Sequence, residues 1–282
     1  MNSKLKIGMC FCKLLALSLM TASCDDQPAG GVRAYEASGK WGLVDDMGNI
    51  ISKPRWDFME PIPTHPRTPI LVQNNGLFGF VDYSGTVVIK PEWEFALGFV
   101  EQLAIVGDGS KFGYINLEGE VVIKLTFDGA GWFSDGLAHV AVGDKWGYID
   151  KAGNMVIEPK WVNAEMFKEG FARVRDDHDR FGFINATGKV VIEPRWRNAF
   201  SFSEGLAAVE VSDGTTSKWG YIDANGDVCI DPQWGRVRSF NGGYAKVYRS
   251  FFDPTEYEII DRTGEPQERS VERTRADDGS NH

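Results

Sequence analysis

Acidic residues recur at fixed intervals along this chain of 282 residues, and their chemistry is the first question that the sequence raises. Each of five aspartates follows two large apolar residues and stands three positions before a glycine: Asp45, Asp82, Asp150, Asp223 and Asp261. Carboxylates gathered in space could bind a divalent cation or cleave a glycosidic bond. These five stand far apart in a stacked array, and Asp just before a Gly is typical of a turn. We therefore interpret them as turn caps.

A second set of acids is also periodic. One acid stands just before each stretch of the GLAHV type, at Glu101, Asp135, Glu169 and Glu204, and Gly242 takes this place in the next copy. Catalytic residues are usually unique in a chain, so acids that recur with a repeat indicate a structural role. A hydrolase built on these carboxylates is the weakest of the functional hypotheses.

Histidine and cysteine give no stronger catalytic signal. Cys229 stands in the middle of an apolar triplet, which predicts a small buried core residue. The histidines occupy unrelated positions without metal-ligand spacing: His65, His139, His178 and His282. No nucleophile elbow, phosphate loop or dinucleotide fingerprint occurs. We therefore predict a protein that is not an enzyme, with no catalytic residue, no metal site and no cofactor.

The acids belong to a longer repeat. KWGYID at Lys145 to Asp150 returns letter for letter at Lys218 to Asp223, and a worn seventh copy surrounds Tyr257. The spacing between copies is 34 to 38 residues. An aromatic residue and a glycine open six of the copies: Trp41, Gly42, Phe78, Gly79, Phe112, Gly113, Trp146, Gly147, Phe181, Gly182, Trp219 and Gly220. Residues 31–264 are therefore predicted to hold seven repeats of about 36 residues.

Each repeat reads as a small antiparallel sheet. The aromatic-glycine stretch and an apolar triplet such as Val190-Val191-Ile192 flank the Asp-x-x-Gly turn, as two strands of a hairpin. A proline and an aromatic follow, and proline is expected to end the strand because it lacks an NH. The alternating GLAHV stretch is the third strand. We predict a three-stranded meander, with room for a fourth short strand in the connector.

This frame resembles the WG, or KWG, repeat proteins of bacteria over about residues 31–264. The resemblance implies an all-β repeat domain without an assigned catalytic activity. A lone meander cannot bury both faces, so the repeats must stack, with the first aromatic ring in the contact and the glycine admitting a close neighbour. Seven such repeats favour a propeller-like arrangement. An open β-solenoid is the alternative.

The N-terminus predicts export. Three lysines precede the short apolar run Leu14 to Met20, and Thr21-Ala22-Ser23 then leads to Cys24, an order that resembles a bacterial lipobox. Residues 1–23 would be a lipoprotein-type signal peptide, Cys24 the lipidated residue, and 24–30 a linker. The expected location is the cell envelope, with a lipid anchor in the inner membrane, facing the periplasm, or in the outer membrane. The charged stretch 265–282 has no apolar periodicity and is predicted to be a disordered tail.

Charge and composition narrow the partners. A net charge of -10 and no basic stripe argue against nucleic acid. We expect an unknown envelope protein, bound by an interaction scaffold, or alternatively a cell-wall glycan. Sugars stack on exposed indoles, which makes the second tryptophan set candidate ligand contacts: Trp56, Trp93, Trp161, Trp196 and Trp234. Three segments that break the repeat are stronger candidates for specificity: Met59 to Pro69, Arg175 to Arg180 and Val211 to Lys218.

Overall fold

The computed structural model describes residues 31–271, apart from residues 66, 213, 252 and 254. The predicted signal peptide at 1–23, the linker at 24–30 and the lipidation site Cys24 lie outside the described residues. The chain divides into two compact units. Met1–Phe133 with Val140–Gly143 form the first unit, and Ser134–His139 with Asp144–His282 form the second.

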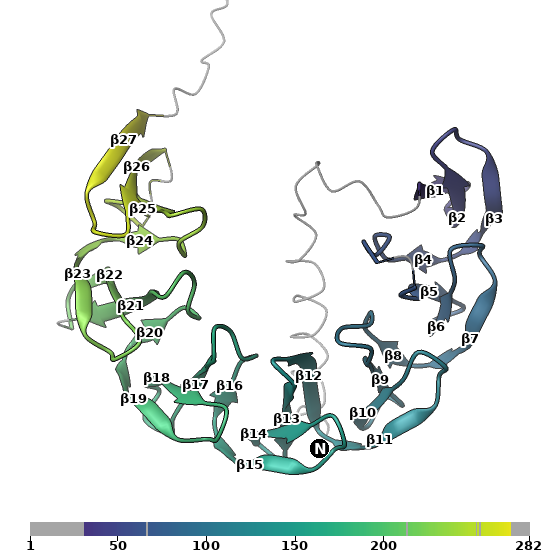
Figure 1. The fold of residues 1–282 in the computed structure, drawn as a ribbon, viewed down its shortest axis with the longest axis horizontal. Coiled ribbons are helices and arrows are strands. Elements are labelled where there is room, and N and C mark those ends of the chain that lie inside the picture. Colours follow the sequence, from purple (N-terminus) through teal and green to yellow (C-terminus); the bar gives the residue numbers. More distant parts are fainter. Residues whose placement is uncertain (1–30, 66, 213, 252, 254, 272–282) are drawn as a thin grey trace, which may run out of the picture. The chain divides into compact units, whose positions relative to one another are not determined.

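The described residues form seven antiparallel sheets and no helix, and Figure 1 labels the strands. The first sheet has three strands: β1 (Val32–Ala37), β2 (Lys40–Asp45) and β3 (Ile50–Trp56). The next two sheets hold β4 (Phe58–Met59), β5 (Ile70–Asn74), β6 (Leu77–Val81), β7 (Val87–Trp93), and then β8 (Phe95–Ala96), β9 (Ala104–Gly107), β10 (Phe112–Ile115), β11 (Val121–Phe127).

The remaining four sheets also have four strands each, in chain order. They are β12 (Gly129–Ser134), β13 (Leu137–Val142), β14 (Lys145–Asp150), β15 (Met155–Trp161); β16 (Asn163–Ala164), β17 (Phe171–Arg175), β18 (Phe181–Asn185), β19 (Val190–Trp196); β20 (Asn198–Ala199), β21 (Ala207–Ser212), β22 (Ser217–Ile222), β23 (Val228–Trp234); and β24 (Arg236–Val237), β25 (Tyr244–Tyr248), β26 (Glu256–Asp261), β27 (Pro266–Val271).

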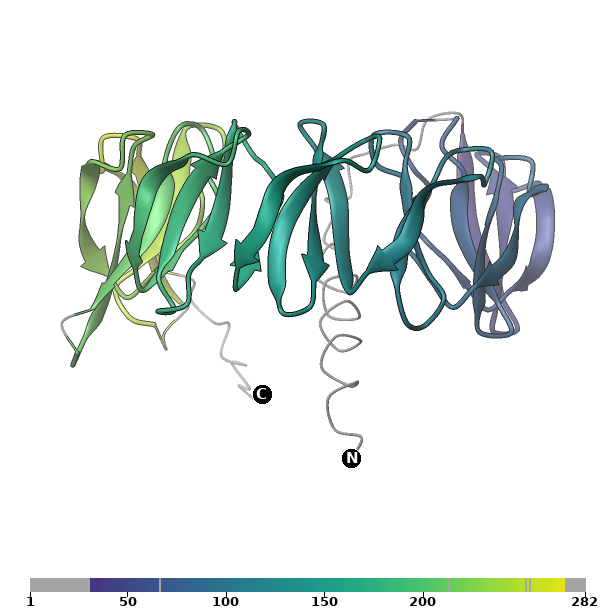
Figure 2. The same cartoon turned by 90° about the horizontal axis from the view of Figure 1, so that it is seen from below.

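These sheets confirm the predicted all-β chain of repeated antiparallel meanders. The short connector strand is the first strand of each four-stranded sheet, and it is two residues long in five of the six. The aromatic-glycine strand is therefore the third of four. Figure 2 shows the strands of a sheet side by side with a visible twist. A four-stranded meander of this kind is the unit from which propeller blades are built.

The predicted disordered tail begins too early. Residues 266–271 form β27, which pairs with β26 from Glu256 opposite Val271 to Ile260 opposite Pro266. A strand at the edge of a sheet is held by its backbone ladder on one side, so it needs no alternating apolar residues. The sequence PQERSV gave no such alternation, which is why the strand escaped prediction.

The aromatic-glycine step fits a bulge in the next strand. Trp146 pairs with Trp161, but the neighbouring pair on this ladder has shifted to Ile157, so three residues of β15 lie opposite Gly147. A Cβ on Gly147 would meet the Ile157 carbonyl oxygen at 2.3 Å and the Pro159 nitrogen at 2.7 Å. The atoms that exclude a side chain therefore belong to the same repeat. All six copies share this contact.

Proline does not end the strand, contrary to the prediction. Pro159 lies inside β15, which continues to Trp161. The bulge explains the exception, because the register shift leaves the proline without a ladder partner to which an NH would have to donate.

The core between consecutive sheets is built from a second aromatic position. The ring two residues after the first aromatic packs on a phenylalanine 19 residues later, which lies in or just after the first strand of the following sheet. The ring centroids lie 4.8 to 5.0 Å apart in Phe80–Phe99, Tyr114–Phe133, Tyr148–Phe167, Phe183–Phe202 and Tyr221–Phe240. Where this ring is tyrosine, its hydroxyl donates to a backbone carbonyl, as from Tyr148 to Glu165 at 2.8 Å.

The first aromatic is less buried than this second one. Trp219 is buried, but Trp41, Trp146 and their phenylalanine counterparts are half-buried. Cys229 is exposed, so its prediction as a core residue was wrong. The bulged outer strand buries the third residue of its apolar triplet, here Ile230, and leaves the first two outside.

Candidate functional site

The periodic aspartates are turn caps, as their spacing predicted. Asp150 Oδ1 accepts hydrogen bonds from the backbone NH groups of Ala152 at 2.9 Å and Asn154 at 2.8 Å. Equivalent bonds are made by Asp45, Asp82, Asp223 and Asp261. Hydrogen bonds within the turn hold the pKa of Asp150 below its usual value, Asn154 contributing most. In the part of the chain that the structure describes, no three His, Cys, Asp or Glu side chains are grouped to hold a metal ion.

The second acid set ties one repeat to the next. The carboxylate of Glu169 accepts the backbone NH groups of Glu204 at 2.7 Å and Gly205 at 2.9 Å. Glu204 in turn accepts those of Gly242 and Gly243, at 2.6 and 2.8 Å. The carboxylates of Glu169 and Glu204 are therefore committed to backbone groups, as the structural interpretation expected.

The second tryptophan set is mostly enclosed. Four of its members are 4 to 8% exposed: Trp56, Trp161, Trp196 and Trp234. Trp93 is half-buried. Basic side chains from the preceding position stack on three of these rings, with Arg55, Lys160 and Arg195 lying 4.6 to 5.0 Å from the ring centroids. A sugar needs an open ring face, so the structure argues against the predicted ligand contact for the four buried tryptophans.

The first irregular segment encloses a carboxylate. Glu60 follows β4 and accepts the backbone NH of Leu71 at 2.7 Å. Its other oxygen lies against Gly98, where a Cβ would stand 2.4 Å from it. Burial raises the pKa of Glu60 to about 7, and the bond from Leu71 opposes that change. Nearby, the Tyr83 hydroxyl donates to the carbonyl of Pro63, which holds the segment to β6 and its turn.

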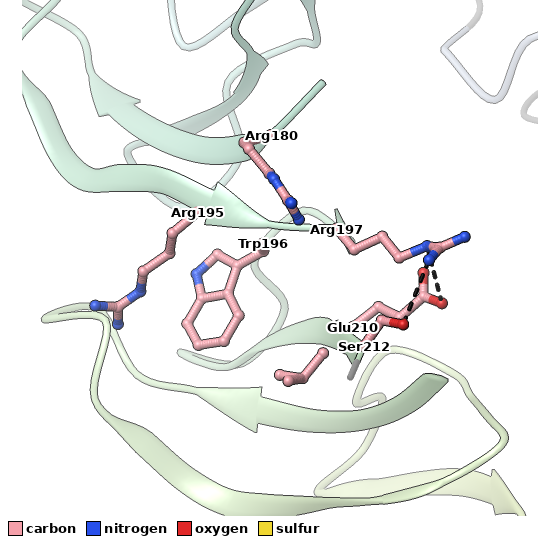
Figure 3. A pocket seen from close by; sticks show the side chains of 7 residues that line it. Arg180, Arg195, Trp196, Arg197, Glu210 and Ser212 are labelled. Carbon is pink, nitrogen blue, oxygen red and sulfur yellow. Dashed lines mark hydrogen bonds and ion pairs between the residues drawn. The ribbon is translucent and has the colours of Figure 1, made fainter. Parts of the chain in front are cut away.

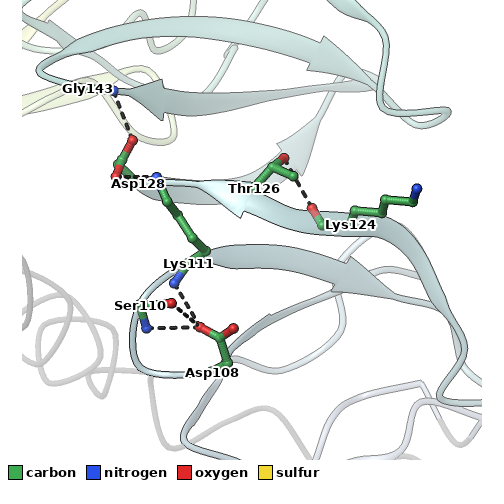
Figure 4. Close-up of polar contacts among 7 residues, drawn as sticks. All are labelled: Asp108, Ser110, Lys111, Lys124, Thr126, Asp128 and Gly143. Atoms are coloured by element: carbon green, nitrogen blue, oxygen red, sulfur yellow. Dashed lines mark hydrogen bonds and ion pairs between the residues drawn. The ribbon is translucent and has the colours of Figure 1, made fainter.

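Three lysines that stand directly before the aromatic-glycine step form an ion pair, and in two repeats the partner is an aspartate 17 residues later; the third, Lys145, pairs with Asp177 instead. Both pairs with the 17-residue spacing lie in the first unit, and Figure 4 shows one of them: Lys111 Nζ lies 2.6 Å from Asp128 Oδ1, and Asp128 Oδ2 accepts the backbone NH of Gly143 at 2.9 Å. The lysine lowers the pKa of Asp128. Lys40 and Asp57 form the same pair, and Asn75 supplies the backbone NH at 2.8 Å. We call this arrangement the lysine-aspartate clamp.

The repeat that begins at Phe181 has two cations in the clamp positions. The clamp residues are 17 positions apart, Lys40 to Asp57 and Lys111 to Asp128. The same spacing joins Arg180 to Arg197. The backbone is equivalent, because the backbone NH of Arg197 donates to the Glu210 carbonyl at 3.2 Å, just as the backbone NH groups of Asp57 and Asp128 donate to carbonyls of the next sheet.

A depression of about 260 Å³ opens at these arginines in the second unit, lined by Arg180, Arg195, Trp196, Arg197, Glu210, Val211 and Ser212. Figure 3 shows the Arg180 side chain extending toward Trp196 and Arg197. Arg180 ends one irregular segment, and Val211 and Ser212 begin another. Two of the three segments that break the repeat therefore meet here. We call this depression the arginine pocket.

The three arginines of the pocket differ in the hydrogen bonds and ion pairs that they already form. Arg195 donates to the Gly226 carbonyl at 2.8 Å and stacks on Trp196. Arg197, whose side chain is 59% exposed, lies 3.3 Å from Ser212 Oγ and 4.0 Å from a Glu210 oxygen. Within the described residues, the Arg180 guanidinium has no hydrogen bond or ion pair. The pocket thus offers guanidinium donors that suit a carboxylate or another oxyanion.

The sequence pointed to the two loops, and to Arg180 as the end of one of them, but not to Arg195 or Arg197. The available signal was the clamp spacing, because Arg stands where two other repeats have Asp. It could be interpreted only after the ladder had shown that residues 17 apart face each other.

The fold defines a class: proteins built from tandem β-meander repeats. The chain belongs to the WG containing repeat family, whose model matches residues 41–67, 78–112, 112–146, 146–177, 181–214 and 219–248. This confirms the resemblance seen in the sequence. The last sheet, β24 to β27, shows that a seventh copy folds like the others, although its third and fourth strands lie outside the matched segments.

Comparison with solved structures gives matches at low identity. A eukaryotic initiation factor structure is 13% identical, with a TM-score of 0.58 over 86% of this chain and 74% of that one. BamB from Moraxella catarrhalis is 10% identical, with a TM-score of 0.48 over 85% of each chain. AztD from Citrobacter koseri is 16% identical, with a TM-score of 0.44 over 87% and 82%. No curated protein matches the chain. Among the described residues, no helix has the length and apolar character needed to cross a membrane.

Proposed function

We propose that this protein is a non-enzymatic interaction scaffold of the cell envelope, which binds a partner protein at the arginine pocket. The observation that carries the proposal is the position of the pocket. The repeat pattern is interrupted at two loops, and residues from both loops line one depression. Loops on a rigid repeat scaffold are where binding surfaces commonly lie. The envelope location rests on the signal-like N-terminus and the predicted lipid anchor at Cys24.

The carboxylates that recur with the repeat already accept hydrogen bonds from the chain's own backbone, which supports a binding site at the arginine pocket instead. The turn aspartates cap their own backbone, and Glu169 and Glu204 hold the following repeat. Four tryptophans of the second set are buried. Stacking of a glycan on those rings therefore has less support than protein binding, which can use the guanidinium groups and the exposed Val211 at the mouth of the pocket.

A co-purification experiment tests the proposal. The full chain with its native N-terminus is expressed in a bacterial host that carries the partner, extracted from membranes and analysed for stoichiometric partners. We expect the double substitution Arg180→Ala with Arg197→Ala to lose the partner. A control, Lys189→Ala with Arg262→Ala, removes the same charge from exposed positions of the same unit and is expected to retain it. Equal recovery by both variants would reject the pocket as the binding surface.

A further inference from the structure

The lysine-aspartate clamp occupies the positions in other repeats that are equivalent to Arg180 and Arg197 of the arginine pocket, so the two can be compared. In two repeats of the first unit, the same two positions hold one cation and one carboxylate. That carboxylate does two things: one oxygen binds the lysine and the other accepts a backbone NH from the next hairpin. Cation, carboxylate and backbone donor form a complete set, with each charge compensated inside the chain.

The pocket has the same backbone pairing as the clamps, but no carboxylate at the position of Asp57 and Asp128. Phe181 pairs with Trp196 as Trp41 pairs with Trp56, so the residues that flank each pair occupy matching places on the ladder. Arg180 fills the lysine position and Arg197 replaces the aspartate. Two guanidinium groups that converge on one depression repel each other unless an anion lies between them.

Glu210 compensates only part of this charge. Its oxygen lies 4.0 Å from Arg197 Nε, which is at the limit of an ion pair, and its side chain is 15% exposed. Arg195 is already bound to Gly226 and stacked on Trp196. Arg180 remains the guanidinium with no acceptor among the described residues.

We propose that a side-chain carboxylate of an aspartate or glutamate in the partner protein enters the pocket, bridges Arg180 and Arg197, and supplies the group that Asp57 and Asp128 supply elsewhere. The group replaced in the frame is a carboxylate, which selects this chemistry over phosphate. A volume of about 260 Å³ admits one acidic side chain. Val211, 41% exposed, offers an apolar contact for its methylene carbons. This inference rests on the proposed scaffold function and names the chemistry of its partner.

Binding is tested on the purified full chain by following the arginine Nε–Hε signals in NMR spectra. The probes are the capped peptide acetyl-(Gly-Glu)4-amide, its Gln counterpart, glucuronate and inorganic phosphate. Substitution of each arginine by lysine assigns the signals. We expect the Glu peptide to shift the Arg180 and Arg197 signals saturably and the Gln peptide to leave them unchanged. A Glu peptide that binds no better than phosphate would mark an unselective anion site and overturn the inference.

The variant Arg197→Asp is the sharpest test, because it rebuilds the clamp with Arg180 as its cation. We expect it to fold as the natural chain does and to bind the Glu peptide at least tenfold more weakly. Arg180→Gln should weaken binding by a similar factor, and it keeps the test valid if Arg197→Asp does not fold. Unchanged affinity in the folded variants contradicts the proposal.

Two further comparisons separate the alternatives. Asp213 is adjacent to Ser212 in the sequence and lies outside the described residues; Glu-peptide binding that appears only in Asp213→Asn would show that the chain fills its own pocket, against the inference. Stronger binding of glucuronate than of the Glu peptide would also reject a protein carboxylate. If the double-alanine variant loses the cellular partner but the natural chain does not bind the Glu peptide, the scaffold function is supported and the carboxylate as its ligand is rejected. If the natural chain binds the Glu peptide but the double-alanine variant keeps the cellular partner, the carboxylate site is supported and the pocket as the scaffold's binding surface is rejected.

Discussion

Replacing Gly147 by alanine tests the central structural argument, that the glycine of the aromatic-glycine step faces a backbone bulge. A Cβ there would stand 2.3 Å from the Ile157 carbonyl oxygen and 2.7 Å from the Pro159 nitrogen. Ordinary van der Waals contact at a Cβ is 3.4 to 4 Å. The backbone of β14 or β15 must therefore move by about 1 Å, since no flexible side chain can give way.

The expected cost follows from overpacking. Small-to-large substitutions in packed sites cost about 1–3 kcal/mol, and contacts with backbone lie at the upper end. We expect Gly147→Ala to lower the free energy of unfolding by about 3 kcal/mol or more. Gly170→Ala is the matched control in the same unit, because Gly170 has a φ of +80° with no atom within 4 Å. Its cost arises from the left-handed backbone alone, about 1–2 kcal/mol.

Urea denaturation followed by tryptophan fluorescence measures both variants against the natural chain. The difference in midpoint at unchanged slope gives the difference in stability. If Gly147→Ala costs no more than Gly170→Ala, the bulge does not require glycine and the account of the repeat is wrong.

Three other predictions concern Glu60, one lysine-aspartate clamp and the lipid anchor that the sequence predicts. The pKa of Glu60 rises from 4.5 to about 7 on folding, so the folded chain binds more protons between these values and stability falls as pH rises from about 4.5 to 7, by on the order of 3 kcal/mol in full. In Glu60→Gln the denaturation midpoint should therefore depend less on pH between pH 5 and 8. The exposed control Glu118→Gln should keep the pH dependence of the natural chain. A double-mutant cycle on Lys111 and Asp128, whose side chains are each 40% exposed, should give a coupling of about 0.2–1 kcal/mol that decreases in high salt; a larger, salt-independent coupling would contradict a solvent-screened pair. Cys24→Ser should release the protein from membranes in fractionation, and unchanged membrane association would count against the predicted lipid anchor.

The repeat made the local structure predictable. Asp three residues before Gly closes a turn through bonds between neighbours in sequence, so its role at Asp150 could be read from the letters alone. The antiparallel strands on either side followed from the same turn. These features depend on contacts only a few residues apart, which a short pattern records.

Register and exposure could not be predicted in the same way. The bulge opposite Gly147 shifts the pairing of β15, and this shift places Pro159 inside a strand. A second register shift in the equivalent β23, between the pairs Tyr221–Ile230 and Ile222–Val228, falls at Cys229, which is exposed. A change of register exchanges the faces of a strand, so apolar letters alone do not say which side is buried. The edge strand β27 was missed for a related reason: its partner lies on β26, and its own sequence carries no burial pattern.

The sequence predicted the loops of the candidate site but not their grouping in space. The loops at Arg175 to Arg180 and Val211 to Lys218 broke the repeat visibly, but their approach to one depression depends on the stacking of successive sheets. The pairing of Arg180 with Arg197 required the ladder register, because side chains 17 positions apart in sequence carry no local signal. The repeat then supplied what a single sheet could not, a comparison with Asp57 and Asp128 at the same place.

The charge of the whole chain adds a condition to the proposed binding. A net charge of -10 repels an acidic partner at long range, whereas Arg180 and Arg197 attract its carboxylate at contact. Salt screens the first effect before the second, because charges more than about 8 Å apart interact weakly at physiological ionic strength while a partly enclosed pair is screened less. The association constant for the Glu peptide should therefore rise from very low salt to about 0.1 M and fall at higher concentrations. A steady fall from the lowest salt would mean that the pocket's positive field extends well beyond contact, and that the acidity of the remaining surface does not oppose the approach of the partner.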